Sequence, residues 1–116
     1  MRLISSFGFT WNGLKMAWRE QPNLRIHFLA LAVVVSLGFY FRIQPWEWCS
    51  LLVAGAVVIS LELINTAIEN LTDMVTQERN AIAGKVKDIS AAAVMVAAVA
   101  SVVVGIIIFS KYILSS

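Results

Sequence analysis

The chain has 116 residues, of which 59% are hydrophobic and 14% charged, and its formal net charge is +2 at pH 7. It is too short for two domains and too apolar for an ordinary soluble domain, which would leave long uncharged segments in water. The basic residues are scattered along the chain, so nucleic acid is not an expected partner. Cys49 is the only cysteine, which excludes an intramolecular disulfide. We therefore predict one all-α integral membrane domain over residues 1–116.

Residues 3–19 mix aromatic and basic side chains, which is typical of a helix that lies in the membrane interface. Trp11 and Trp18 supply the large rings of this segment. Gly8 and Gly13 interrupt its apolar stripe, so the pattern is compatible with one helix and equally with a frayed or two-piece helix.

Three later segments are long and apolar enough to cross the hydrocarbon layer as helices, at about 1.5 Å of rise per residue. The first covers residues 24–41, and Pro45 follows it in a turn because proline disfavours helix in the residue before it. The second span covers residues 46–75. A polar loop over residues 76–87 then leads to the third span, residues 89–114, whose small residues allow close helix packing.

The Lys and Arg residues near the predicted spans indicate the orientation, because cytoplasmic segments carry the excess of positive charge. Arg42 and Lys111 would lie on one side of the membrane. The others would lie on the opposite side: Arg2, Lys15, Arg19, Arg25, Arg79, Lys85 and Lys87. The N-terminus and the 76–87 loop are therefore predicted to be cytoplasmic.

A strip of polar side chains begins where the apolar part of the second span ends. A helix turns by about 100° per residue, which places five of these side chains on one face. We call them the carboxylate strip: Glu62, Asn65, Thr66, Glu69 and Asp73. An acid at mid-bilayer costs about 2.5–3.5 kcal/mol by insertion scales, so Glu62 is expected to be functional. Asp73 lies farther out and could equally be a solvated surface residue.

Carboxylate and amide oxygens at this spacing suit a bound Mg²⁺ ion and an acceptor for a substrate proton. Lys87, followed by Asp88, could stabilise a transferring phosphoryl group. The chain has neither a GxxxxGK[ST] sequence nor the Gly-rich loop of protein kinases, so any ATP would have to bind to the helices and the loop. The alternative is a non-catalytic membrane subunit or a small transporter, in which the acids relay protons or line a cavity.

The segment ELINTAIE at residues 62–69, with Asp73 and the Lys87–Asp88 pair after it, resembles the signature of the prokaryotic diacylglycerol kinase family, which includes undecaprenol kinases. Further segments that resemble the family lie toward the N-terminus: WNGL at residues 11–14, Trp18, and NLRIH at residues 23–27. The resemblance covers nearly the whole chain. It implies a homotrimer in the bacterial inner membrane, with active sites at subunit interfaces, that uses ATP and Mg²⁺ to phosphorylate diacylglycerol or undecaprenol.

The resemblance also implies roles for individual residues. Glu62 matches the catalytic base, Asn65 and Asp73 match essential polar positions of the catalytic site, and Glu69 matches a metal ligand beside the nucleotide. The other implied contacts form two groups: nucleotide contacts from Glu78, Asn80, Lys87 and Asp88, and lipid contacts from Trp11, Trp18 and Arg25.

One position departs from the family pattern. Counted back from Arg25, the family usually has a second metal-binding acid where this chain has Gln21, and Glu20 lies one residue earlier. Either Glu20 turns inward to replace that acid, or Gln21 uses its carbonyl oxygen. Residues 78–80 also differ, because they read Glu-Arg-Asn where relatives often carry an acid, an aromatic residue and a His. His27 is expected to be a hydrogen-bonding group at the membrane interface.

Overall fold

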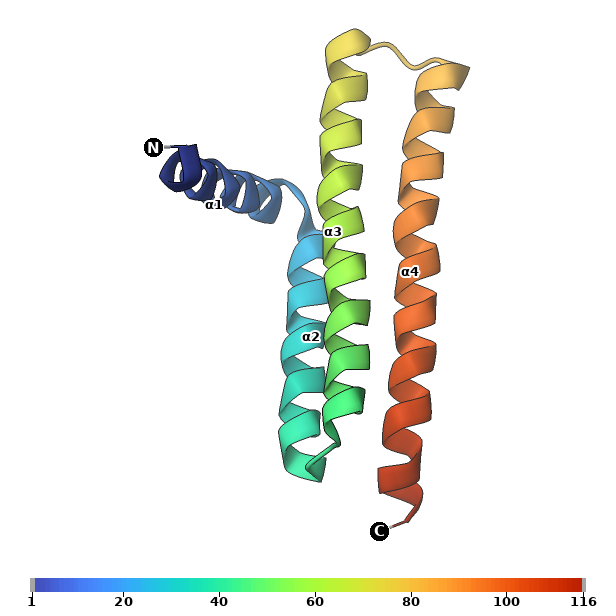
Figure 1. Ribbon diagram of the computed structural model, residues 1–116. Coiled ribbons are helices and arrows are strands. Elements are labelled where there is room, and N and C mark those ends of the chain that lie inside the picture. The colour runs from blue at the N-terminus through green and yellow to red at the C-terminus, as the bar shows by residue number, and fades with distance from the viewer. Residues whose placement is uncertain (1, 116) are drawn as a thin grey trace.

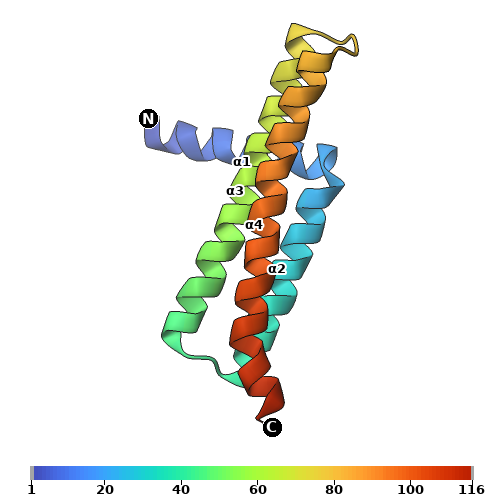
Figure 2. The same cartoon turned by 90° about the vertical axis from the view of Figure 1, so that its right-hand side faces the viewer.

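The computed structural model describes residues 2–115 and consists of four α-helices joined by short connections. Their bounds are Arg2–Glu20 for α1, Pro22–Phe41 for α2, Pro45–Val75 for α3 and Ala81–Leu114 for α4. The helices α3 and α4 lie side by side, and α2 packs along the part of α3 farther from the α3–α4 connection (Figure 1). In both views α1 runs across the direction of the other three helices (Figure 2).

Three helices, α2, α3 and α4, are long and apolar enough to cross a membrane. The all-helical prediction is confirmed, and the first two spans differ from their predicted bounds by no more than two residues. Proline occupies the first position of both α2 and α3, where its missing N–H has no intrahelical partner to lose. Between them Arg42 adopts a left-handed conformation with φ 53°, which ends α2.

The predicted extent of the polar loop, residues 76–87, is wrong because α4 begins at Ala81. Only the residues after Val75 and before Ala81 form the connection between α3 and α4. Asn80 caps α4, since its side-chain oxygen accepts the N–H of Ala83 at 2.8 Å. The charged side chains of residues 85–88 disfavour entry of this segment into the hydrocarbon layer. They do not disfavour a helix, because a helix satisfies its backbone hydrogen bonds in water as well as in lipid. The helix of the third span therefore starts well before residue 89.

The N-terminal helix α1 is continuous from Arg2 to Glu20, so the frayed or two-piece alternative is not observed. Its buried residue is Ala17, which lies on the side of α1 that meets α3 around Leu63 and Ala67. The contact holds α1 against the middle of the carboxylate-bearing half of α3.

A buried ionic cluster joins α3 and α4 at the end away from the carboxylate strip. The carboxylate of Glu47 is fully buried, and its Oε2 lies 2.7 Å from Nζ of Lys111. Its Oε1 accepts hydrogen bonds from the hydroxyl of Tyr112 and, at 2.9 Å, from the backbone N–H of Gln44. The Lys111 ammonium group also lies 5.1 Å from the ring centroid of Trp46. The buried charge is thus paired and hydrogen-bonded, as a charge removed from water must be.

Candidate functional site

The carboxylate strip on α3 passes from a buried to an exposed environment. Glu62 is only 2% exposed, and Asn65 and Thr66 are buried beside it. Glu69 is partly buried, whereas the side chain of Asp73 is 55% exposed. A substrate group that must be shielded from water would therefore meet Glu62, and a solvated one would meet Asp73.

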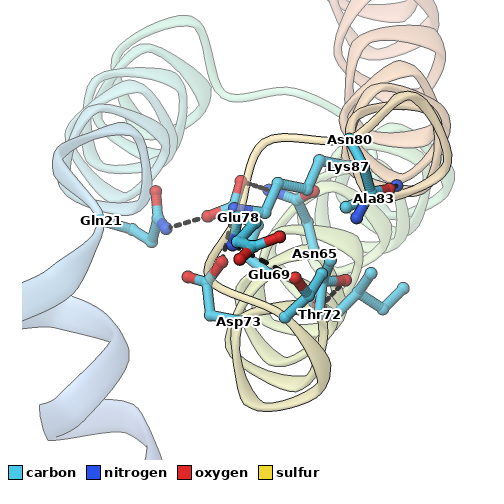
Figure 3. Close-up of polar contacts among 11 residues, drawn as sticks. Gln21, Asn65, Glu69, Thr72, Asp73, Glu78, Asn80, Ala83 and Lys87 are labelled. Atoms are coloured by element: carbon cyan, nitrogen blue, oxygen red, sulfur yellow. Dashed lines mark hydrogen bonds and ion pairs between the residues drawn. The ribbon is translucent and has the colours of Figure 1, made fainter.

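A chain of hydrogen bonds centred on Glu69 joins α3, α4 and the junction between α1 and α2. The amide nitrogen of Gln21 donates to Oε2 of Glu69 at 2.8 Å, and the amide nitrogen of Asn65 donates to Oε1 at 3.3 Å (Figure 3). The side-chain oxygen of Asn65 in turn accepts the hydroxyl of Ser90 on α4 at 2.6 Å. We call these four residues the amide–carboxylate chain. Both oxygens of the Glu69 carboxylate are thereby fixed in position.

The structure brings Gln21, and not Glu20, to Glu69. Gln21 is the extended residue between α1 and α2, with φ −120° and ψ 101°, and from there its side chain points at α3. Glu20 ends α1, and its carboxylate accepts a hydrogen bond from Asn70 at 3.0 Å on an exposed part of the surface. Gln21 thus contacts Glu69 through its amide nitrogen and not through its carbonyl oxygen, and the choice between Glu20 and Gln21 as the second metal ligand stays a prediction.

Lys87 and Asp73 form an ion pair between α4 and α3 near the connection of the two helices. The Lys87 Nζ lies 2.7 Å from Oδ1 of Asp73, and both side chains are substantially exposed (Figure 3). An exposed pair of this kind contributes only about 0–1 kcal/mol to stability. The ammonium group can therefore exchange a carboxylate partner for a phosphate at little energetic cost.

The other predicted nucleotide contacts lie around this pair. Asn80 uses its side chain to cap α4. The backbone N–H of Glu78 donates to the hydroxyl of Thr76 at 3.1 Å, which shapes the short connection. Asp88 follows Lys87 on α4 and is exposed. Glu78 and Asn80 thus lie near the Lys87–Asp73 pair (Figure 3), and Asp88 is the sequence neighbour of Lys87.

The predicted lipid contacts gather on α1 and the start of α2. Trp11 and Trp18 line a hollow of about 540 Å³ together with Phe28, whose ring centroid is 5.6 Å from that of Trp18. Arg25 donates hydrogen bonds to the backbone oxygens of Trp18 at 2.8 Å and Arg19 at 3.1 Å. Its guanidinium group therefore caps the end of α1 and fixes the bend between α1 and α2.

Two contacts of the carboxylate strip were missed by the sequence analysis. His27 was expected only at the interface, but its Nε2 lies 3.6 Å from Oε2 of Glu62. Ser90 was not selected at all, although it supports Asn65. The sequence did offer one indication of Ser90: its hydroxyl lies one helical turn after Lys87 and directly before the apolar run Ala91-Ala92-Ala93.

An apolar groove of about 570 Å³ lies between α2 and α4, with α3 as its floor. Val34 from α2, Val58 from α3 and Val102 from α4 are among its lining residues. His27 lines it at the end nearer the carboxylate strip, so an imidazole borders a mostly apolar space.

The donor set fits magnesium only in part. No group of three His, Cys, Asp or Glu side chains that could hold a metal ion occurs among residues 2–115. Glu69 is the one carboxylate of the amide–carboxylate chain, and Gln21 and Asn65 turn their amide nitrogens, not their oxygens, toward it. Mg²⁺ is usually bound through one or two carboxylates and the phosphates of a substrate. These residues therefore fit Mg²⁺ that is held jointly with a nucleotide.

Comparisons with known proteins agree on one family. A sequence model of the family described as prokaryotic diacylglycerol kinase matches residues 8–109. The undecaprenol kinase of Bacillus subtilis is 34% identical over 108 residues, which cover 93% of this chain and 88% of that protein. The diacylglycerol kinase of Synechocystis sp. is 35% identical over 104 residues, covering 89% of this chain and 59% of that protein. The diacylglycerol kinase of Escherichia coli K12 is 28% identical over 102 residues, covering 88% and 84%.

Proposed function

Because the chain belongs to the prokaryotic diacylglycerol kinase family, and is therefore a membrane lipid kinase, we propose that it transfers the γ-phosphoryl group of ATP to the hydroxyl of diacylglycerol or undecaprenol. The observation that carries this proposal is the gradient along the carboxylate strip. A buried carboxylate at Glu62 suits a lipid hydroxyl, and the exposed Lys87–Asp73 pair suits a nucleotide phosphate.

Glu62 acts as the general base in this proposal. As the lipid hydroxyl oxygen forms a bond to the γ-phosphorus, its proton passes to the Glu62 carboxylate, and the bond from the γ-phosphorus to the bridging oxygen of ADP breaks. General-base catalysis typically contributes about 10²–10⁴-fold. Thr66 donates its hydroxyl to the backbone oxygen of Glu62 at 2.9 Å, so it leaves the Glu62 carboxylate free for this work.

The nucleotide binds at the exposed end of the strip. Lys87 faces its phosphates as a point charge, and Asp73 holds the ammonium group in place until the phosphate arrives. Glu78, Asn80 and Asp88 border this position and complete the nucleotide contacts.

Glu69 would hold Mg²⁺ together with the phosphates of ATP, and Gln21 would become a further ligand only by turning its amide oxygen toward the cation in place of the nitrogen that now faces Glu69. When bound, the cation neutralises negative charge on the transferring group. Before the cation binds, hydrogen bonds from Gln21 and Asn65 hold the Glu69 carboxylate in position. Glu20, held by Asn70, has no part in it.

The remaining features concern the assembly and its membrane. We propose that α1 lies in the membrane interface, where Trp11 and Trp18 contact the lipid substrate and Arg25 holds α1 at the required angle. The N-terminus and the α3–α4 connection face the cytoplasm of the bacterial cell, where ATP is found. The protein is a homotrimer with sites at subunit interfaces, because three spans are too few to shield a reaction centre from water alone.

The activity can be tested directly with purified protein in lipid nanodiscs. Radiolabelled phosphate from [γ-³²P]ATP should appear in the lipid fraction only when Mg²⁺ and a lipid alcohol are both present, and parallel samples with diacylglycerol and undecaprenol identify the preferred substrate. Glu69→Gln should nearly abolish transfer, whereas Glu20→Gln, its matched control, should not. Normal transfer by Glu69→Gln at ordinary Mg²⁺ would remove Glu69 from the metal site. The absence of label from both lipids would contradict the proposed activity and favour a non-catalytic subunit or transporter.

The trimer has its own test. Chemical crosslinking in mild detergent should produce species of up to three subunits and no larger. A monomer that retains full activity would contradict the assembly without contradicting the kinase activity.

A further inference from the structure

His27 and Glu62 form a polar contact within a largely apolar interface between α2 and α3. The Nε2 atom of His27 lies 3.6 Å from Oε2 of Glu62. The Glu62 side chain is buried, and that of His27 is 22% exposed. Leu24 and Val58 are buried in the same part of the molecule. A carboxylate in such surroundings needs a polar partner, because burial without one is costly.

Long stretches of α3 and α4 beside the pair carry no ionisable side chain. The second span has no Asp, Glu, Lys, Arg or His between Glu47 and Glu62, and α4 has none between Asp88 and Lys111. Among residues 2–115, His27 is the only ion-pair partner of the Glu62 carboxylate. Within this part of the chain, the imidazole is therefore the group placed to orient the carboxylate before lipid binds.

We propose that His27 is a positioning residue for Glu62. Its Nε2–H holds Oε2 of the carboxylate, which leaves Oε1 to take the proton of the lipid hydroxyl. The proposal rests on the role of Glu62 as general base given above. His27 itself does not receive the substrate proton and contacts the reaction only through Glu62.

The distance of 3.6 Å is longer than a hydrogen bond, which spans about 2.7–3.2 Å for N–H···O. Catalytic hydrogen bonds are often long before substrate binds and shorten in the complex with substrate. His27 also lines the apolar groove, so it stands between that space and the carboxylate. A small shift of α2 against α3 on lipid binding would close the contact and fix the base at the moment it is needed.

The contact can be measured without any activity assay, because His27 is the only histidine of the chain. ¹⁵N spectra of histidine-labelled protein in nanodiscs report this imidazole alone. At fixed pH, Glu62→Gln should shift the imidazole nitrogen signals. Glu69→Gln, which changes a carboxylate held by Gln21 instead, should leave them in place. Signals that are identical in wild-type protein and Glu62→Gln would overturn the proposal.

The kinetic arm separates positioning from other roles. His27→Leu removes the donor and should lower kcat by about 10-fold to 100-fold, below the full 10²–10⁴-fold of the base itself, with the KM for ATP unchanged. His27→Gln places an amide N–H near the position of Nε2 and should recover most of the loss. In a Glu62→Gln background, His27→Leu should cause no further loss, because residues that act as a unit are not additive. Ser101→Ala, also in the groove wall, is the control and should match wild-type protein.

The outcomes distinguish this proposal from the proposed function. If His27→Leu lowers kcat equally in wild-type and Glu62→Gln backgrounds, or raises only the KM for lipid, His27 does not act through Glu62 and the proposal is overturned while the kinase activity stands. If the wild-type protein phosphorylates no lipid, the proposed function fails and the spectra still decide the contact. If His27→Leu fails to assemble, the ¹⁵N spectra and the kcat of His27→Gln test the proposal instead.

Discussion

Replacement of Gln21 by glutamate should make the stability of the protein depend on a divalent cation. In the wild-type chain the amide nitrogen of Gln21 donates to the Glu69 carboxylate at 2.8 Å. Gln21→Glu puts an oxygen in place of that nitrogen, so the hydrogen bond is lost and two carboxylates face each other. A cation held between them would turn this repulsion into a shared binding site.

The size of the effect follows from the geometry. If the two carboxylates relax to a separation of about 4 Å, they repel by about 4 kcal/mol at an effective dielectric constant of about 20. Both side chains are partly exposed, and salt screens exposed charges, so we expect a loss of about 1–3 kcal/mol without a cation. Saturation with Mg²⁺ at about 100 times its dissociation constant would return about 2.7 kcal/mol.

Thermal unfolding in detergent, first with EDTA and then along a Mg²⁺ titration, measures both parts. Gln21→Glu should melt below wild-type protein in EDTA and show the larger rise with Mg²⁺. Glu20→Gln is the matched control, because Glu20 pairs with Asn70, and its response to Mg²⁺ should equal that of wild-type protein. Equal melting temperatures in EDTA, with equal Mg²⁺ responses, would refute the placement of Gln21 against Glu69.

Two further predictions concern stability away from the site. A Cβ atom at Gly38 would lie 2.6 Å from the Trp48 ring, so Gly38→Ala should destabilise the α2–α3 packing by about 1–3 kcal/mol, whereas Gly84→Ala, with no atom within 4 Å, should be neutral or slightly stabilising; equal melting temperatures for the two variants would argue against this packing. Lys111→Met leaves the buried carboxylate of Glu47 without its counter-ion and should lower the midpoint of denaturant unfolding, while turnover per folded protein stays unchanged. An unaltered midpoint would mean that the ion pair is absent.

The helices could be predicted from the sequence because their signals are local. Long apolar runs define α2, α3 and most of α4, and the prolines at Pro22 and Pro45 mark where two of them begin. The start of α4 was misplaced because charge was taken as the end of the helix, when it only limits how far the helix can enter hydrocarbon. The Asn80 cap, whose oxygen accepts the N–H of Ala83 three residues on, was the local signal that would have located it.

The site could be predicted only as far as one helix determines it. The alignment of Glu62, Glu69 and Asp73 follows from helical rotation alone, and α3 carries all three. The contacts of Gln21 with Glu69 and of His27 with Glu62 depend on how α2 is rotated against α3, which periodicity does not specify. The cluster around Glu47, at the other end of the molecule, likewise combines a local contact with a long-range one.

The hydrogen bond from the Gln44 N–H to the Glu47 carboxylate belongs to a capping box, a local pattern that the sequence could have shown. The pairing of Glu47 with Lys111 joins residues far apart in the chain and depends on the packing of α3 against α4.

Glu62→Gln tests the central claim most directly, because the amide keeps the size of the side chain and loses the proton acceptor. The measurement compares kcat for lipid phosphorylation with the affinity for ATP in the same preparation. We expect kcat to fall by about 10²–10⁴-fold while ATP affinity changes little, since the proposed nucleotide contacts lie at the other end of the strip. An unchanged kcat with a raised KM for lipid would make Glu62 a binding residue and would place the base elsewhere, at Asp73 or Asp88.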